Sequence, residues 1–308
     1  MRFYLAPLEG ITGFIFRNAY FHHFGRMDRY FTPFIPTMER LSMKIERDLL
    51  PENNQGMELI PQLIVREPEE VLKMMSLLRP LGYSRVNLNM GCPAGTVVAK
   101  GRGAGMLADP EALDIFFTRL FHMYNGPVSV KTRIGLQEPG EWEALLAVYR
   151  KYPFEELIIH PRLKTDKYLG QPRLEAFRRA AEEVKVPLCY NGDIYHIEDF
   201  QRIRQQFPGT DRIMLGRGVL RDPFLVERLQ GETPADKSRI WDFLEELMEG
   251  YLRVFKGEVD AIYHIKEIWS YLQHSFPGQE KLMKKIRKAR NLTAYREAVA
   301  DLRRNVEE

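Results

Sequence analysis

Cysteine is scarce in this sequence, and its scarcity excludes a class of folds. Only Cys92 and Cys189 occur among the 308 residues, so a framework of several disulfides is excluded and two reduced cysteines of a cytoplasmic protein are expected. No C-x-x-C or H-E-x-x-H spacing is present, and we expect no metal site. No apolar run approaches the length of about 18 residues that a membrane span requires. The N-terminal stretch MRFYLAPLEG reaches Pro7 and Glu9 too early for a signal peptide.

Charge of one sign is not in large excess either. The net charge is +3, and hydrophobic residues make up 44% and charged residues 28% of the chain, as is ordinary for a soluble globular protein. A length of 308 residues predicts about two domains. The overall composition therefore does not point to nucleic acid, and only the distribution of the charges can do so.

Short apolar runs alternate with amphipathic segments as far as about residue 230, which predicts β-α units around a parallel sheet. The expected strands are residues 3–6, 29–35, 58–65, 85–89, 128–132, 156–160, 187–191 and 212–216. The expected helices are residues 14–24, 68–78, 110–124, 141–152, 173–184, 197–206 and 222–230, with a less regular crossover at 38–48.

These units fit a closed (β/α)₈ TIM barrel at residues 1–232. The alternative is a doubly wound open sheet, which usually carries a G-x-G-x-x-G loop after its first strand. Here that turn reads APLEG, so we favour the barrel. After a linker at 231–235 the strand signals stop, and residues 236–308 predict a small C-terminal helical bundle domain with helices at 237–255, 259–276, 279–288 and 293–305.

Polar or glycine residues lie near the end of nearly every expected strand, at the rim where barrel active sites lie. Each of them alone could be a cap or a surface turn, but together they predict a site. They are Pro7 and Glu9, Gln62, Asn87 and Asn89, Lys131 and Arg133, His160 and Arg162, Asn191 and Asp193, and Gly216 and Arg217.

The turns after the last two strands indicate a phosphate site. They read Asn191-Gly192-Asp193 and Leu215-Gly216-Arg217-Gly218, and glycines let backbone N–H groups approach phosphate oxygens while an arginine adds charge. The alternative is two tight turns with an arginine on the surface. A phosphorylated cofactor or substrate is therefore expected.

Lys131 is expected to point into the mouth of the barrel, where its ammonium could stabilise negative charge on a reduced flavin ring. The Gln62 amide suits the donor and acceptor edge of the same ring, and His160 could reach the ring or a substrate carbonyl. The alternative for Lys131 is a buried ion pair with Glu9 or Asp193.

Cys92 is the candidate reactive group. It follows the strand at 85–89 and precedes a glycine-rich loop at 95–108 that contains Lys100 and Arg102. A thiol with a pKa of about 8.5 is mostly protonated at neutral pH and can donate a proton. The alternative is a buried structural cysteine, which fits Cys189 better because Cys189 lies within an apolar strand. The loop's glycines suggest that it moves and closes on a substrate.

The order of these motifs resembles the tRNA-dihydrouridine synthases, flavin enzymes that reduce uridine in tRNA. The most specific match is Leu88-Asn89-Met90-Gly91-Cys92-Pro93 with Gly103-Ala104-Gly105-Met106-Leu107 after it. The other matches are APLEG at 6–10 with Phe16-Arg17, PQL at 61–63, VKTR at 130–133, HPR at 160–162 with Tyr168 and Gly170, and the two phosphate turns.

This resemblance implies FMN at the barrel mouth and NADPH or NADH as its reductant. Reduced FMN would pass a hydride to C6 of the uracil, and Cys92 would protonate C5 as a general acid. The implied FMN contacts are Pro7, Leu8, Gln62, Lys131, His160, Asn191, Gly192, Asp193, Gly216 and Arg217. The implied or expected substrate contacts are Asn89, Lys100, Arg102, Arg133 and Arg162.

Three positions depart from the family pattern without removing a group that the reaction needs. Leu8 replaces the usual Met and keeps an apolar contact. Asn87 stands where Asp is usual. Pro161 replaces Gly after the histidine, fixing φ and removing an N–H.

The basic charge is concentrated near the C-terminus, as tRNA binding would require. Six basic residues lie within 281–290, and we expect Lys284, Lys285 and Lys288 among them to contact the tRNA backbone. The alternative is a solvated helix face. Trp269, in the preceding helix, is expected in the core.

Two rival functions stay open. A dihydroorotate-dehydrogenase-like flavoprotein would share the barrel and FMN, and a tRNA-binding chaperone would lack catalysis. We expect a cytoplasmic monomer.

Overall fold

The computed structural model describes residues 1–25, 27–234, 236 and 238–307. The chain forms two compact units. The barrel unit comprises Met1–Pro7, Asp28–Asp193 and Gln201–Leu215, and the helical unit comprises Leu8–Met27, Ile194–Phe200 and Gly216–Glu308. The helical unit thus includes segments that precede the expected linker at 231–235, and the division into 1–232 and 236–308 stays a prediction.

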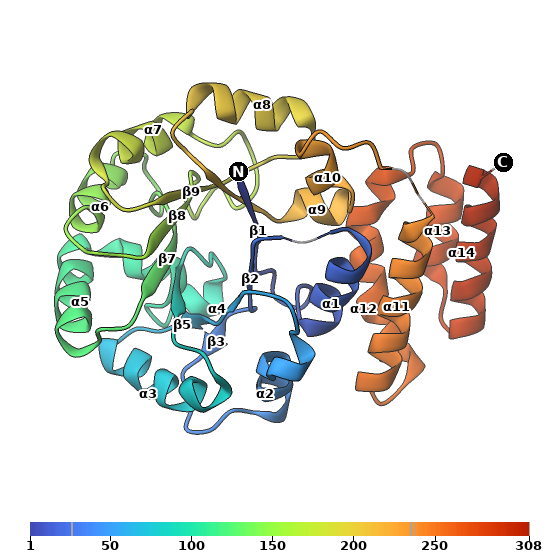
Figure 1. Ribbon diagram of the computed structural model, residues 1–308, viewed down its shortest axis with the longest axis horizontal. Coiled ribbons are helices and arrows are strands. Elements are labelled where there is room, and N and C mark those ends of the chain that lie inside the picture. Colours follow the sequence, from blue (N-terminus) through green and yellow to red (C-terminus); the bar gives the residue numbers. More distant parts are fainter. Residues whose placement is uncertain (26, 235, 237, 308) are drawn as a thin grey trace. The chain divides into compact units, whose positions relative to one another are not determined.

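The strands of the barrel unit pair only in parallel among the described residues. Figure 1 shows them as a curled inner layer with helices around them. They are β1 (Arg2–Leu5), β2 (Arg29–Phe31), β3 (Ile35–Pro36), β4 (Leu59–Ile60), β5 (Gln62–Ile64), β6 (Val86–Met90), β7 (Val128–Arg133), β8 (Glu156–His160), β9 (Leu188–Asn191) and β10 (Arg212–Leu215).

Two of the expected strands are each divided in two, and the divided strands close the sheet. The order is β3-β5-β6-β7-β8-β9-β10-β1-β2-β4. One end of this order is the pair β3-β5, and the other end is the pair β2-β4. Because β2 and β3 form one expected strand and β4 and β5 form the next, both end pairs belong to the same two strands, and the sheet closes on itself. Pro33 and Pro61 lie at the divisions, where a residue without an N–H interrupts the ladder. The predicted eight-stranded TIM barrel is confirmed.

Helix α5 (Pro110–Met123) of the barrel unit begins at a side-chain cap. Asp109 Oδ1 accepts hydrogen bonds from the N–H groups of Glu111 and Ala112, each at 3.0 Å, and Pro110 follows at the first helical position. The helices are α2 (Met43–Leu49), α3 (Pro68–Leu78), α4 (Gly95–Val98), α5 (Pro110–Met123), α6 (Glu141–Tyr149) and α7 (Leu174–Glu183), with 3₁₀ turns η1 (Pro51–Asn53), η2 (Arg79–Leu81) and η3 (Gly103–Ala108). Helix α8 (Ile197–Gln206) begins in the helical unit's segment 194–200.

The helical unit buries apolar faces of its longer helices. Trp269 is 1% exposed, as predicted, and its Nε1 donates to Tyr295 Oη at 3.0 Å. The elements are α1 (Phe14–His23), α9 (Arg217–Arg221), α10 (Leu225–Leu229), α11 (Arg239–Val254), α12 (Glu258–Leu272), η4 (Gln273–Ser275), α13 (Glu280–Lys288) and α14 (Leu292–Glu307). None of the described helices combines the length and hydrophobicity that a membrane crossing requires.

A cluster of apolar side chains fills the inside of the barrel. It contains Tyr4, Ala6, Phe31, Ile60, Ile158, Cys189 and Met214. Cys189 is fully buried there, which confirms its predicted structural place. The barrel is therefore closed by a packed core, and the polar strand ends stand above that core.

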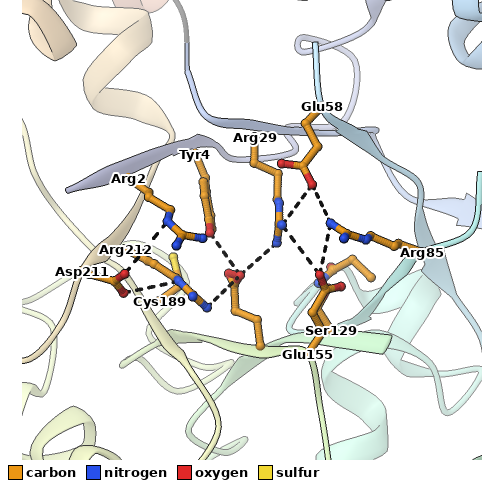
Figure 2. Close-up of polar contacts among 12 residues, drawn as sticks. Arg2, Tyr4, Arg29, Glu58, Arg85, Ser129, Glu155, Cys189, Asp211 and Arg212 are labelled. Atoms are coloured by element: carbon orange, nitrogen blue, oxygen red, sulfur yellow. Dashed lines mark hydrogen bonds and ion pairs between the residues drawn. The ribbon is translucent and has the colours of Figure 1, made fainter. Parts of the chain in front are cut away.

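Below the core, the amino-terminal ends of the strands carry a network of charged side chains, part of which Figure 2 shows. The carboxylate of Glu156 is completely buried and accepts hydrogen bonds from Tyr4 Oη at 3.2 Å and Arg29 Nη1 at 3.1 Å. Arg29 also donates to Glu58 at 3.0 Å, and Glu58 accepts from Arg85 at 2.7 Å. Residues at this end of a TIM barrel serve stability.

We expect Glu156→Gln to flatten the pH dependence of stability. Burial raises the pKa of Glu156 to about 7, against the opposing effect of Arg29 and Arg212. Between pH 4.5, the ordinary pKa of a glutamate, and pH 7, the folded state therefore binds more protons at Glu156 than the unfolded state does. The wild-type free energy of unfolding should fall across that window by up to about 3 kcal/mol.

Urea denaturation at intervals from pH 4.5 to 8 measures this effect. Glu155→Gln is the matched control. The Glu155 carboxylate belongs to the same network, is partly exposed and lies 3.7 Å from Arg29, and its removal leaves Glu156 intact. Equal pH slopes for wild type and Glu156→Gln would show that the buried carboxyl does not take up this proton.

Candidate active site

The barrel mouth, which we define as the carboxyl ends of the barrel-unit strands, brings together most of the predicted site residues. The strand register pairs Gln62 with Asn87, Asn89 with Lys131, and Arg133 with His160. Pro7, Asn191, Gly192 and Asp193 follow strands of the same unit, whereas Leu8, Gly216 and Arg217 belong to the helical unit.

A continuous chain of side-chain hydrogen bonds runs across β5, β6 and β7. Asn89 Nδ2 donates to Gln62 Oε1 at 2.8 Å, and Gln62 Nε2 donates to Asn87 Oδ1 at 2.8 Å. Asn87 Nδ2 then donates to Ser129 Oγ at 2.9 Å. Gln62, Asn87 and Ser129 are at most 2% exposed, so these bonds satisfy groups that water cannot reach.

The upper end of this amide chain holds the backbone at Cys92. Asn89 Oδ1 accepts from the N–H of Gly91 at 3.1 Å and from the N–H of Cys92 at 2.9 Å. A backbone N–H can only donate, so the Asn89 oxygen must face it, and this fixes the direction of each amide below. Asn89, which we expected at the substrate, therefore positions Cys92 as well.

The glycine-rich loop packs directly against Cys92. Ala104 N donates to Cys92 O at 3.0 Å. A Cβ on Gly103, whose φ is +56°, would lie 3.0 Å from Cys92 Cβ and 2.9 Å from Val97 Cγ1. A Cβ on Gly105 would lie 2.8 Å from Val98 O. Much of the loop is folded as α4 and η3. At these two positions the structure thus requires glycine for close packing and, at Gly103, for a left-handed turn, where the sequence suggested movement.

Lys131 lies in the barrel mouth and has no ionic partner among the residues that the structure describes. Asp193 pairs with Arg162 instead, at 2.7 Å, and no ion pair of Lys131 exists in the part of the chain that the structure describes. Burial, assisted by the positive charge of Arg133, lowers the pKa of Lys131 to about 8. The alternative of a buried ion pair with Glu9 or Asp193 is not seen within those described ranges.

Arg133 and Arg162 bind loop carbonyls, where we expected them to contact the substrate. Arg133, 2% exposed, donates to the carbonyl oxygens of Gly91, Leu163 and Lys167 at 3.0, 2.8 and 3.0 Å. Arg162 is fully buried and donates to both oxygens of Asp193, at 3.0 and 2.7 Å, and to the carbonyl of Gly170. Both guanidiniums are thus hydrogen-bonded within the protein, and their contact with the substrate stays a prediction.

His160 lies at the end of β8, 7% exposed. Its ring lies 6.2 Å from the ring of Tyr168, with 29° between the planes. The guanidinium of Arg133 lies 5.5 Å from the centre of the Tyr168 ring on the same loop. The histidine is thus at the rim predicted for it, and an aromatic side chain accompanies it.

The two predicted phosphate turns differ in what they offer. Asn191 Nδ2 donates to Met214 O at 2.9 Å. A Cβ on Gly192 would lie 2.2 Å from Tyr190 Oη, so the close approach of that side chain requires glycine here. In the helical unit, Gly216 precedes α9, and the Arg217 guanidinium lies 5.7 Å from the centre of the Tyr195 ring.

The remaining expected cations are not equivalent. Lys100 is exposed on the loop, whereas Arg102 pairs with Glu70 Oε1 of α3 at 2.5 Å, which holds the loop. On α13, Lys284, Lys285 and Lys288 are all exposed, and Lys285 pairs with Asp301 at 3.1 Å.

Sequence reasoning missed Ser129 and Glu70. Ser129 ends the amide chain and donates to Val86 O at 3.3 Å. It lies two residues before Lys131 on β7, and this period of two, which puts both side chains on one face, was the signal that could have revealed it. Glu70 lies far from Arg102 in sequence, and no local sequence pattern indicates that the two residues form an ion pair.

We expect Gly103→Ala to disturb Cys92, because the new methyl group meets Cys92 and φ is left-handed. Stability should fall by about 1–3 kcal/mol. Urea denaturation measures this, and the rate of alkylation by iodoacetamide reports on Cys92 because Cys189 is fully buried.

Gly95→Ala is the matched control in the same loop, since its Cβ would meet nothing within 4 Å. If Gly103→Ala unfolds at the same urea concentration as Gly95→Ala and is alkylated at the same rate, the close packing at Cys92 has no such consequence.

Comparison with known proteins finds relatives that match most of this chain. The tRNA-dihydrouridine(16) synthase of Ralstonia nicotianae is 27% identical over 303 residues, covering 93% of this chain and 91% of the relative. That of Pseudomonas putida is 29% identical over 303 residues, covering 94% and 93%. A solved structure of morphinone reductase, 14% identical with a TM-score of 0.51, covers 77% of this chain and 88% of its own, and shares the fold.

The model of the family described as dihydrouridine synthase matches residues 4–308. This range includes the strand ends, the amide chain and the C-terminal helices described above. The resemblance that the motifs predicted is confirmed, and the chain belongs to the dihydrouridine synthase family.

Proposed function

We propose that this chain is a tRNA-dihydrouridine synthase that uses FMN and NADPH, or NADH as the alternative reductant, to convert uridine in tRNA to 5,6-dihydrouridine. Membership of the family and the names of the relatives support this reaction and substrate. One observation carries the proposal. Cys92 follows β6, and Lys131, which has no ion pair among the described residues, lies on the neighbouring strand β7.

The residues of the barrel mouth fit FMN. The Lys131 ammonium has no ionic partner among the described residues, and Gly192 carries no side chain beside the backbone N–H groups that would meet the phosphate. Asp193 would offer its backbone N–H, since its carboxylate already pairs with Arg162. Pro7, Leu8, Gln62, His160, Asn191, Gly216 and Arg217 complete the proposed set.

FMN, when bound and reduced, supplies the hydride that C6 of the uracil receives. The chain's own part is to supply the proton for C5, and Cys92 is the candidate because it is partly exposed and its backbone is held by Asn89. Because the pKa of Lys131 is about 8, most of its side chains are positively charged at neutral pH and can stabilise negative charge in the mouth.

Two alternatives carry less support. A small-molecule flavoprotein of the dihydroorotate-dehydrogenase type would share the barrel, but the family match extends to residue 308 and includes the C-terminal helices. A binding protein without catalysis would not need a partly exposed cysteine beside an unpaired lysine. The relatives named for position 16 make uridine 16 the first tRNA position to examine. A cytoplasmic monomer stays a prediction.

We expect Cys92→Ala to keep FMN and to lose reduction of tRNA by about 100-fold or more, because only the proton donor is removed. The flavin absorbance of the purified protein gives the FMN content, and mass spectrometry of tRNA from a deletion strain complemented by each variant maps dihydrouridine.

Cys189→Ala is the control, because it alters the only other thiol, which is fully buried in the barrel core. Full activity of Cys92→Ala would refute the proton-donor role. A colourless wild-type protein that leaves every tRNA uridine unreduced would refute the proposed function as a whole.

The exposed face of α13 is the proposed tRNA-binding surface of the helical unit. Met283 and Ile286 face the core, at 4% and 0% exposure, which turns the lysines outward. Lys285 shares its charge with Asp301, whereas Lys284 and Lys288 have no ion pair within the described ranges. A lysine that neutralises a phosphate releases counterions that were condensed on the RNA, and a lysine without an ion pair is free to do so.

We expect the double variant Lys284→Ala/Lys288→Ala to bind tRNA more weakly and with a flatter salt dependence. The slope of log affinity against log salt should fall by about 0.7–0.9 for each phosphate that no longer meets a lysine. Filter binding at several salt concentrations measures it, with Lys285→Ala as the control that should change the slope less. An unchanged slope in the double variant would place the tRNA elsewhere.

A further inference from the structure

The loop after β8, residues 163–173, is held from beneath by two buried arginines. Arg133 donates to the carbonyls of Leu163 and Lys167 at 2.8 and 3.0 Å, and Arg162 donates to the carbonyl of Gly170. Because both guanidiniums are at most 2% exposed, these bonds lie in surroundings where they are worth more than on a surface. The backbone around Tyr168-Leu169 is therefore fixed on both sides.

The same loop carries backbone strain. Lys167 has φ of 52° and is the only non-glycine residue with positive φ in the described ranges, and Gly170 follows with φ of 67°. A left-handed conformation costs a lysine about 1 kcal/mol or more. Such strain persists where the surroundings impose it, and here Arg133 holds the carbonyl of Lys167 itself. The two left-handed residues enclose Tyr168 and Leu169.

The strained turn presents an apolar side chain to solvent. Leu169 is 78% exposed, and among the large hydrophobic residues described only Met43 is more exposed. A single exposed leucine is ordinary, but this one is held outward by a strained and doubly anchored backbone. Tyr168 differs, because its ring lies near both Arg133 and His160.

The charges around Leu169 favour a polyanion. Lys164 and Lys167 have no ion pair in the described part of the chain, and the loop's one carboxylate is already used. Asp166 pairs with Arg173 and accepts from the N–H of Leu163 at 2.8 Å. Two lysines without an ion pair among the described residues thus lie five and two residues before an outward leucine, at the rim of the mouth that contains Cys92.

We propose that Leu169 enters the base stack of the bound RNA and occupies the place that the target uridine leaves when it turns into the barrel mouth. Lys164 and Lys167 contact the phosphates on either side. Proteins that unstack bases commonly insert an apolar side chain next to basic residues, and enzymes that react with a stacked base must turn it out. This role rests on the proposed function, because it requires RNA whose uridine reaches Cys92.

A protein partner would be a poorer match for this loop. One exposed leucine with two lysines in the same loop offers far less area than the roughly 800 Å² per partner of a stable protein interface. A nucleic acid needs only one apolar side chain to fill one vacated base position, and it supplies phosphates for both lysines.

The test compares tRNA carrying the target uridine with tRNA carrying an abasic nucleotide there, after the reduced position has been mapped. Wild-type protein should bind the abasic tRNA about ten-fold more tightly or better, because no base must be unstacked and Leu169 fills the gap. Leu169→Ala should lose most of this preference. Leu169→Met, which keeps a long apolar side chain, should retain it. Thermal melting and flavin content of each variant confirm that the fold is intact.

Two outcomes would overturn the proposal. One is a Leu169→Ala variant whose affinity for the two tRNAs falls by the same factor, which would make Leu169 an ordinary surface contact. The other is a variant that binds both as the wild type does. Failure of the proposed function is separate, because it would appear as wild-type protein that forms no dihydrouridine in any tRNA.

Discussion

The two hydrogen bonds that Asn89 Oδ1 accepts from the N–H groups of Gly91 and Cys92 are the constraint on which the barrel mouth depends. A backbone N–H cannot reverse its role, so the Asn89 amide has one orientation, and Gln62 and Asn87 must follow it. The usual Asp of the family at position 87 would still accept from Gln62. With Asn87 the bond to Ser129 is donated instead, and Ser129 directs its own proton to Val86. The departure therefore keeps the direction of the chain.

The arginines of the mouth are constrained in a similar way. Arg133 and Arg162 satisfy backbone carbonyls of the loops after β6 and β8, and Arg162 also neutralises Asp193. Buried carbonyls that lack a donor are costly, so loops of irregular shape need such donors to lie in one place. Both guanidiniums are hydrogen-bonded, whereas the Lys131 side chain has neither a hydrogen bond nor an ion pair among the described residues. The hydrogen-bonded loops thus surround this lysine and Cys92, whose backbone N–H is held by Asn89.

Much of this arrangement could be predicted from the sequence, because strand periodicity is local. Alternation of apolar runs and helices indicated eight β-α units, and register then placed Gln62, Asn89 and Lys131 at one rim. The division of two strands at Pro33 and Pro61 could have been anticipated, since proline cannot complete a ladder. The use of Arg133 and Arg162 could not, because an arginine's partner is set by the path of distant loops. Nothing in the order of residues distinguishes an arginine that binds phosphate from one that binds carbonyls.

The glycine-rich loop shows where sequence evidence is ambiguous in principle. Glycine is needed where a backbone must move, where φ is positive, and where two backbones approach closely, and composition alone cannot separate these reasons. At Gly103 the second and third apply together, because φ is +56° and Cys92 lies where a side chain would be. The consequence concerns function more than mobility. The loop packs against Cys92 through the bare backbone of Gly103, and Asn89 accepts the hydrogen bond of the Cys92 N–H. A residue held in this way loses little entropy when the substrate arrives.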